Sequence, residues 1–155
     1  MKIRQEIIKL ISTFFYTGYL PLIPGTFGSM AGLLVFYLIK DNTSVFALVT
    51  FVILILGFAV TSEAENIFRR KDASCIVIDE VSGMLLSLLF LPYSARVVVI
   101  AFFLFRILDT LKPYPAGRLQ NLKGSLGIMS DDIVAALYTN IILQLALRFI
   151  SVKAS

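Results

Sequence analysis

Histidine is absent from the sequence, and cysteine occurs only once, at position 75. Because zinc sites are built from cysteine and histidine, this composition argues against a zinc enzyme. A Ser-His-Asp triad and a phosphohistidine intermediate are excluded, since both need an imidazole. Cys75 is followed by Ile-Val-Ile-Asp and not by an arginine-bearing phosphate loop, so we interpret it as a structural thiol. The chemistry left to the chain uses carboxylates, hydroxyls, arginine, lysine and a hard metal ion.

Charge is also scarce. Charged residues make up 15% of the chain and hydrophobic residues 58%, against about 25% and roughly 45–50% in a typical soluble domain. With a mean hydropathy of +0.89, the sequence predicts a membrane protein. The net charge of +4 is spread out and forms no basic stripe with interleaved aromatics. Nucleic acid is therefore not an expected partner, whereas anionic lipid headgroups are.

The length of 155 residues suits one domain covering residues 1–155. Residues 43–61 carry no charge and are long enough to cross a membrane, so they predict a transmembrane helix. The first 20 residues are amphipathic and predict a helix at the membrane interface. We expect further helical segments at 30–39, 63–72, 81–91, 97–105 and 133–147, separated by loops at 21–29 and 112–130.

Three further features of these segments can be drawn from the sequence. The runs 81–91 and 97–105 are each too short to span alone, so whether residues 81–105 cross the bilayer is open. In the last helix, Asn140 and Gln144 are four residues apart and share a face. Most lysines and arginines lie in the N-terminal segment, in 62–80 and in 106–130, which the positive-inside tendency assigns to the cytoplasmic side.

Half of the ten acidic residues lie in or beside apolar runs. They fall in three motifs: Asp79-Glu80 in IVIDEVSGM, Asp109 with Arg106 and Lys112 in FRILDTLKPYP, and Asp131-Asp132 in GIMSDDIVAA. Charge beside hydrocarbon is costly unless it is paired or binds a metal. The concentration of charge in these motifs predicts a functional site, on the cytoplasmic side of the membrane.

Each motif also has a purely structural interpretation. The two acidic pairs suit the first turn of a helix, with Ser130 as a cap before Asp131. Arg106 and Asp109 suit an ion pair within one helix, on a face shared with Lys112. The functional interpretation is that paired carboxylates bind Mg²⁺, while arginine and lysine bind a phosphate group. The predicted metal ligands are Asp79, Glu80, Asp131 and Asp132.

A glycine-containing segment, PGTFGS at 24–29, precedes the apolar run 30–39. Glycines allow backbone N–H groups to turn toward an anion, and a following helix start adds positive potential. A simple turn with a helix cap explains the segment equally well. It lacks the Gly-Lys-Ser/Thr ending of a Walker A loop. The candidate phosphate-binding residues are Gly25, Thr26, Gly28 and Ser29, together with Arg106 and Lys112.

In order and spacing, these four motifs resemble those of the bacterial phosphatidylglycerophosphatase A family, over roughly residues 20–150. The resemblance implies a Mg²⁺-dependent phosphatase of the cytoplasmic membrane that converts phosphatidylglycerophosphate to phosphatidylglycerol and phosphate. It also implies a compact all-α bundle, of about five to six helices, with one central helix ringed by the others. A glycine common after the family's Asp-Asp motif is Ala136 here. The family's charged motif residues correspond to Asp79, Glu80, Arg106, Asp109, Lys112, Asp131 and Asp132.

The residues by themselves indicate the same chemistry without naming a substrate. Bound Mg²⁺ would polarise a phosphoryl oxygen, and Arg106 and Lys112 would neutralise charge on the transferring group. Whether water or a carboxylate attacks phosphorus is open, as are the number of metal ions and the oligomeric state. The alternatives are a helical phosphatase for another lipid or small phosphomonoester, a small ion-binding or transport protein, and a non-catalytic scaffold. A transporter would carry its charges near the middle of spanning helices, whereas these lie at the ends of apolar runs.

Overall fold

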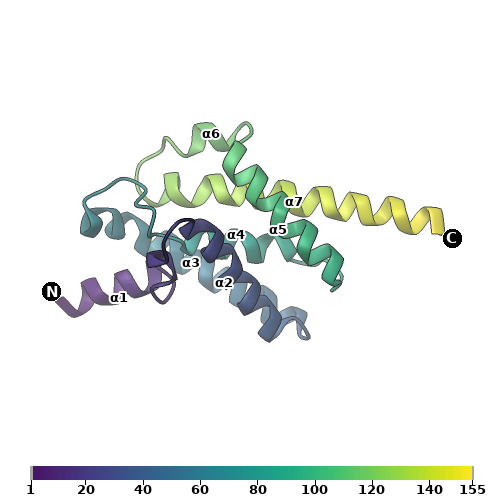
Figure 1. Cartoon of the computed structure of the whole chain (residues 1–155), viewed down its shortest axis with the longest axis horizontal. Helices are drawn as coiled ribbons and strands as arrows, with labels where there is room; N and C mark the ends of the chain where they lie inside the picture. The colour runs from purple at the N-terminus through teal and green to yellow at the C-terminus, as the bar shows by residue number, and fades with distance from the viewer. Residues whose placement is uncertain (1, 155) are drawn as a thin grey trace.

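The computed structural model describes residues 2–154, and within them the chain is entirely helical (Figure 1). This confirms the expected all-α class. Seven α-helices occur in this part of the chain, more than the expected five to six, because the predicted loop 112–130 contains a short helix of its own. The elements are α1 (Lys2–Ser12), the 3-10 helix η1 (Thr17–Tyr19), α2 (Pro24–Ile39), α3 (Thr43–Phe68), α4 (Ile78–Leu88), α5 (Ala95–Leu111), α6 (Ala116–Leu119) and α7 (Ser125–Ala154).

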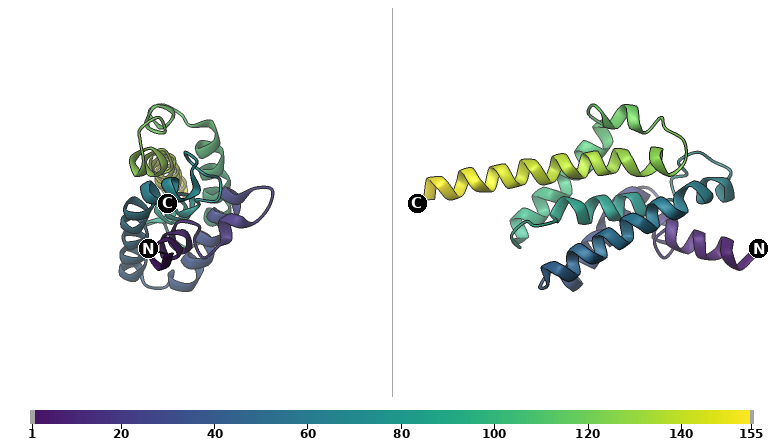
Figure 2. Two further views of the ribbon diagram at one scale, coloured as in Figure 1. Left: turned by 90° about the vertical axis from the view of Figure 1, so that its left-hand side faces the viewer. Right: turned by 180° about the vertical axis from the view of Figure 1, so that it is seen from behind.

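Helix α4 is the centre of the bundle. It packs against α2, α3, α5 and α7, and nine of its 11 residues are buried. Figure 2 shows the longer helices α3 and α7 running past it on either side of the bundle. The central helix that the family resemblance implied is therefore present. Because α4 is surrounded, its two charged residues are largely enclosed: Asp79 is buried and Glu80 is partly buried.

The ends of the two predicted loops, at 24–29 and 125–130, are helical instead. Helix α2 begins at Pro24, so Gly25 to Ser29 form its first turns; proline is well suited to a first helical position, where its missing N–H is not needed. Helix α7 begins at Ser125, so Asp131 and Asp132 lie in its second turn and Ser130 is not a cap. Glycine and serine favour loops locally, but packing against α4 overrides that preference.

The end of α5 differs from the prediction as well. The helix stops at Leu111, and Lys112 follows with a left-handed backbone (φ 46°). Arg106 and Asp109 therefore share a helix face, but Lys112 does not continue it. The prediction of one face for all three residues was wrong, since the chain turns at Lys112 before the prolines that follow.

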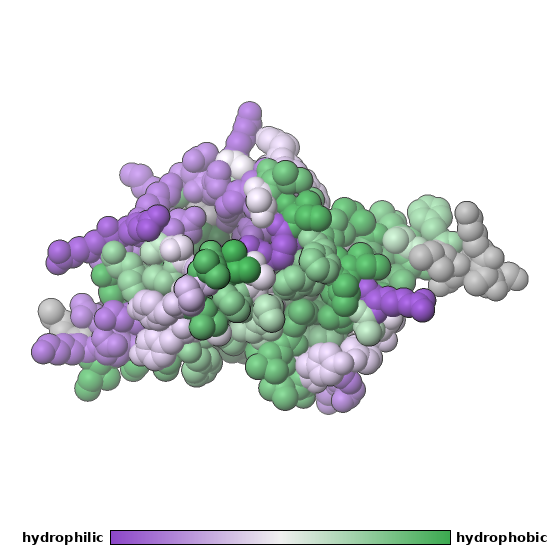
Figure 3. Space-filling model, in the orientation of Figure 1, coloured by the Kyte–Doolittle hydropathy of each residue, from purple (hydrophilic) through white to green (hydrophobic). Residues whose placement is uncertain are grey.

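Among the described residues, two helices are long and apolar enough to cross a membrane, at Thr43–Phe68 and Ser125–Phe149. The first contains the predicted span 43–61. Helix α4, at 11 residues, is too short to cross on its own. Large apolar side chains are exposed along α2, α3, α5 and α7, and hydrophobic surface covers much of the face in Figure 3, with polar residues gathered at the upper left. A surface of this kind is suited to lipid contact.

Asn140 and Gln144 lie on one face of α7, as predicted, and form hydrogen bonds there that link α7 to the end of α4. The Asn140 Nδ2 donates to the carbonyl oxygens of Leu86, Ser87 and Leu89, at 3.4, 3.0 and 2.8 Å. Gln144 Nε2 donates to Asn140 Oδ1 at 2.7 Å and holds that amide in place. The last carbonyls of a helix have no partner within it. Asn140 supplies partners at the end of α4, and so fixes α4 against α7.

Candidate active site

The three charged motifs meet at the N-terminal end of α4. Asp79 and Glu80 stand in the first turn of α4, and Asp132 approaches from α7. One carboxylate oxygen from each of these three residues lies within 4.8 Å of the others. Residues separated by more than 50 positions in the sequence are thus brought together as one acidic cluster, defined here as Asp79, Glu80 and Asp132.

The acidic cluster is buried and incompletely hydrogen-bonded. The exposed fractions of Asp79 and Asp132 are 6% and 4%. Four buried carboxylate oxygens have no hydrogen-bond partner among the described residues, and each belongs to a predicted metal ligand: Asp79 Oδ1, Glu80 Oε2, Asp131 Oδ1 and Asp132 Oδ2. An unpaired buried acceptor costs about 1–3 kcal/mol, and more when it is charged. A cation placed among these oxygens would remove that cost, so the site fits a hard metal ion.

The carboxyl groups of α4 respond to this environment. Burial raises the pKa of Asp79 well above its ordinary value, and the neighbouring charge of Glu80 raises it further. Burial also raises the pKa of Glu80, while Arg106 acts in the opposite direction. Desolvation and like charge both disfavour the ionised forms. A divalent cation would reverse this balance and keep both groups ionised as ligands.

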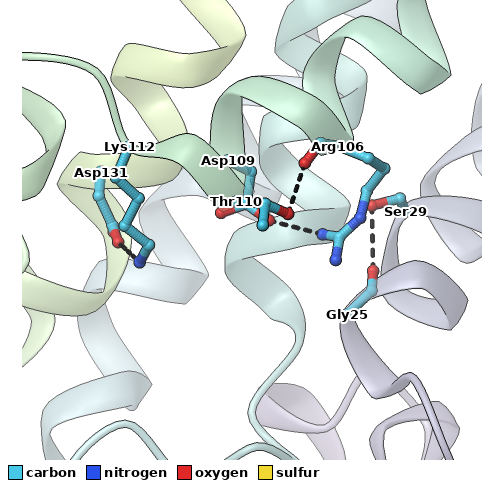
Figure 4. Close-up of polar contacts among 7 residues, drawn as sticks. All are labelled: Gly25, Ser29, Arg106, Asp109, Thr110, Lys112 and Asp131. Carbon is cyan, nitrogen blue, oxygen red and sulfur yellow. Dashed lines mark hydrogen bonds and ion pairs between the residues drawn. The ribbon is translucent and has the colours of Figure 1, made fainter.

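The other two motif carboxylates, Asp109 and Asp131, form ion pairs, which Figure 4 shows. Arg106 Nη1 donates to Asp109 Oδ2 at 2.7 Å, which confirms the predicted pair within α5. Lys112 pairs with Asp131, whose side chain is only 5% exposed. Asp109 and Asp131 thus have cationic partners, whereas Asp79, Glu80 and Asp132 form no ion pair with a described residue. Of the five motif carboxylates, two form ion pairs with an arginine or lysine side chain in the described part of the chain and three do not.

Lys112 reaches Asp131 because of the turn that ends α5. Its left-handed backbone directs the chain away from α5, so that the side chain can meet α7. Burial by itself would lower the pKa of Lys112, but the hydrogen bond and the charge of Asp131 outweigh it, and the pKa is raised. The ammonium group therefore remains charged next to the acidic cluster.

The glycines of the PGTFGS motif bring α2 close to this site. A Cβ on Gly25 would lie 2.4 Å from Glu80 Oε1 and 3.0 Å from Arg106 Nη2, and one on Gly28 would lie 2.9 Å from Val77 Cβ. Neither glycine has a positive φ, so both are needed for close approach and not for an unusual backbone. Figure 4 shows Arg106 extending from α5 toward the start of α2.

The backbone of this motif is less open to an anion than the sequence suggested. The N–H groups of Thr26 and Phe27 both donate to the Ile23 carbonyl, at 3.0 and 3.2 Å. The Ser29 hydroxyl is buried and donates to the Gly25 carbonyl at 3.0 Å. The structure thus brings Gly25 to Glu80 and Arg106, while Ser29 points into its own helix.

Sequence reasoning gave no role to Gly83, one turn after Asp79 and Glu80. A Cβ there would lie 2.6 Å from the Phe105 ring and 3.5 Å from Asp132 Cβ. The missing side chain lets α5 and α7 pack closely on α4 beside the acidic cluster. The signal in the sequence was a glycine inside an otherwise apolar helix, three residues from a charged one.

This arrangement can now be compared with known proteins. The sequence model of a family described as phosphatidylglycerophosphatase A matches residues 10–147. The chain belongs to the phosphatidylglycerophosphatase A family. Membership confirms the resemblance found in the motifs, and makes the protein a phosphatase of a membrane-associated lipid-phosphatase family.

Similar proteins carry two different names. A phosphatidylglycerophosphatase A of Escherichia coli K12 is 35% identical over 129 residues, covering 81% of this chain and 75% of the relative. One from Haemophilus influenzae Rd is 32% identical over 139 residues, covering 87% and 85%. A Bacteroides thetaiotaomicron protein with the provisional name phosphatidylinositol-3-phosphatase is 32% identical over 145 residues, covering 88% and 91%. No solved structure is significantly similar to the chain.

Proposed function

We propose that this family member removes the terminal phosphate of phosphatidylglycerophosphate, giving phosphatidylglycerol and inorganic phosphate, in a Mg²⁺-dependent reaction. The observation that carries the proposal is the set of four buried, unpartnered carboxylate oxygens on Asp79, Glu80, Asp131 and Asp132. They lie where a phosphate would also meet Arg106 and Lys112. The names of the Escherichia coli and Haemophilus influenzae relatives support the choice of substrate.

Asp79, Glu80 and Asp132 are the residues that would hold the metal ion, since their oxygens already converge. Asp131 offers its free Oδ1 from the side, while its other oxygen keeps Lys112 in place. Bound Mg²⁺ supplies polarisation of a phosphoryl oxygen and a water of lowered pKa. The donor set is entirely carboxylate oxygen, which suits a hard divalent cation such as Mg²⁺.

The remaining residues act on the phosphate itself. Arg106 presents a planar guanidinium to the phosphoryl oxygens, and Asp109 fixes its orientation. Lys112 supplies a second positive charge on the opposite side, positioned by Asp131. A carboxylate of the acidic cluster then accepts a proton from the attacking water. The start of α2 at Gly25 closes the site beside Glu80 and Arg106.

We also propose that residues 1–155 form one domain in the cytoplasmic (inner) membrane, with the site at its cytoplasmic face. Helices from both ends of the chain join one bundle, since α1 packs on α3 and α7 on α4. The basic residues concentrate in the segments that flank the site, as the positive-inside tendency requires of cytoplasmic loops.

Phosphate release by the purified, detergent-solubilised protein tests the function. We expect release from phosphatidylglycerophosphate with Mg²⁺ and none with EDTA. Phosphatidylinositol 3-phosphate serves as the second substrate, because one relative carries that name. A higher kcat/KM for the phosphoinositide would change the proposed substrate to that lipid and leave the proposed active site unaltered.

Arg106 variants test the site in the same assay. Arg106→Ala should lower kcat/KM by about 10²-fold, and Arg106→Lys should recover only part of it, since lysine cannot bind bidentately. Full activity in Arg106→Ala would refute the assigned role. Release that is insensitive to EDTA would refute the metal-dependent mechanism.

A further inference from the structure

An open apolar groove lies on α5 directly beside the phosphate-binding arginine. It has a volume of about 360 Å³ and is lined by Phe103, Arg106, Ile107, Thr110 and Leu111. The side chains of Phe103, Ile107 and Leu111 are 60%, 52% and 71% exposed. Residues four apart lie above one another on a helix, so these three form a continuous stripe. Arg106 thus lines the groove and also donates to Asp109.

The stripe continues away from the site. Val99 and Ile100, at 55% and 53% exposure, extend it toward the start of α5. At 1.5 Å per residue, Val99 lies about 10 Å along the helix from Arg106. In Figure 3 hydrophobic surface covers the region where Figure 1 places α5. Arg106 thus lies along the groove, and beyond Phe103 the exposed apolar surface continues toward the start of α5.

A lipid substrate must place its phosphate in a charged site while its acyl chains remain in an apolar environment. Moving an acyl chain from hydrocarbon into water costs about 0.8 kcal/mol per CH₂ group. The chains of a lipid substrate therefore stay in the bilayer while its phosphate reacts. The surface that guides such a chain must be apolar, must contact a phosphate-binding cation and must continue into further exposed apolar surface, and the α5 groove meets all three conditions.

We propose that this groove seats an acyl chain of the lipid substrate while its phosphate group lies at Arg106. The inference rests on the proposed lipid-phosphatase function and deepens it. Hydrocarbon gains little by leaving lipid for an apolar helix face, so the groove acts through shape and position. Its effect is to favour diacyl phosphomonoesters over the same headgroup without chains.

The chain offers a matched pair of variants. Phe103→Ala/Ile107→Ala removes the walls of the groove, and Phe51→Ala/Ile55→Ala removes a Phe–Ile pair of the same spacing on α3, where the exposed fractions are 51% and 67%. For dioleoyl phosphatidylglycerophosphate in mixed micelles, we expect the α5 variant to raise KM about fivefold, a shift near 1 kcal/mol, with kcat within twofold. The deacylated headgroup should be hydrolysed equally by both variants.

An equal change in the two double variants, or an equal change with the deacylated substrate, would overturn the acyl-chain seat. Loss of all phosphate release in the unmodified protein would instead count against the proposed function. In that case photo-crosslinking still tests whether the α5 groove binds an acyl chain, because crosslinking does not require turnover.

The probe for crosslinking is phosphatidic acid with a diazirine in one acyl chain, in detergent micelles. We expect adducts to be several-fold more abundant in residues 99–107 than in residues 51–58. The excess should disappear with the matching phosphatidylcholine probe, which lacks a phosphomonoester. Equal labelling of the two helices, or an excess that persists with phosphatidylcholine, would refute the proposal.

Discussion

Both ends of α4 are buried, but they differ in hydrogen bonding: the polar groups at the C-terminal end have partners, and some of those at the N-terminal end do not. At the C-terminal end, Asn140 donates to three carbonyl oxygens, and Ser87 donates to Gly83. At the N-terminal end, Asp79 and Glu80 each keep an oxygen without a partner. The bundle can therefore hydrogen-bond buried polar groups. Among the described residues, the buried side-chain atoms left without a partner all belong to the two acidic motifs, Asp79-Glu80 and Asp131-Asp132. We interpret this difference as the mark of a ligand-binding site, in line with the proposed function.

Removing one charge from the acidic cluster should give the largest effect. We expect Asp132→Asn to lower phosphate release at saturating Mg²⁺ by about 10²–10³-fold, because a metal ligand that acts on the transition state is lost. The melting temperature in EDTA should stay the same or rise, since one of three converging carboxylates becomes neutral. Phosphate release and thermal unfolding measure the two effects.

Asp41→Asn is the control for this variant, because Asp41 is exposed and pairs with Lys40 on the turn between α2 and α3. It should leave both measurements unchanged. A large fall in the melting temperature of Asp132→Asn without metal would show that the unpaired carboxylates stabilise the fold, so that the two ends of α4 would not differ in this respect.

An intermediate effect is expected at the start of α2. In Gly25→Ala the new Cβ would overlap Glu80 Oε1 and press on Arg106, so both side chains must move. Misplacement of reacting groups by about 1 Å can cost 10²-fold, and we expect kcat/KM to fall by about 10- to 100-fold.

Gly32→Ala is the comparison for Gly25→Ala, since its Cβ would lie 2.9 Å from the Val81 carbonyl oxygen, on the same pair of helices but away from the charged residues. It should lower the melting temperature with a smaller loss of kcat/KM. If both variants lost activity in proportion to stability, Gly25 would have only a packing role.

The smallest effect on activity is expected at the other end of α4. Asn140→Leu removes the donor to three buried carbonyls and should cost about 1–3 kcal/mol of unfolding free energy. The Mg²⁺ concentration for half-maximal activity should remain within twofold. Gln144→Leu should cost less, because Gln144 only supports Asn140. A marked rise in the Mg²⁺ requirement of Asn140→Leu would show that the two ends of α4 are coupled.

The charged residues of the site could be predicted from sequence because their signal is local. An aspartate or an arginine beside a run of apolar residues is costly to bury in any fold. Asp79, Arg106 and Asp132 can therefore be recognised from the linear sequence alone. The same reasoning located the span at 43–61 and the shared face of Asn140 and Gln144. These features depend on composition and helical periodicity, which the sequence carries directly.

Partners and helix starts could not be predicted, because they depend on packing. The pairing of Lys112 with Asp131 joins residues 19 apart across α6, and requires the left-handed turn at Lys112. The first turns of α2 and α7 contain glycine and serine, which locally favour a loop, and contact with α4 makes them helical. Gly25 was singled out as a phosphate-binding residue, although its clearest role is close approach to Glu80 and Arg106.

The ion pairs of Arg106 and Lys112 bear on how the product leaves. Arg106 and Lys112 are already held by Asp109 and Asp131, so an incoming phosphate exchanges one anionic partner for another. Such an exchange gains less free energy than the first pairing of a free cation would. We expect inorganic phosphate to bind weakly and to dissociate readily as the carboxylates return to their cations. The enzyme would then avoid strong product inhibition without a moving lid.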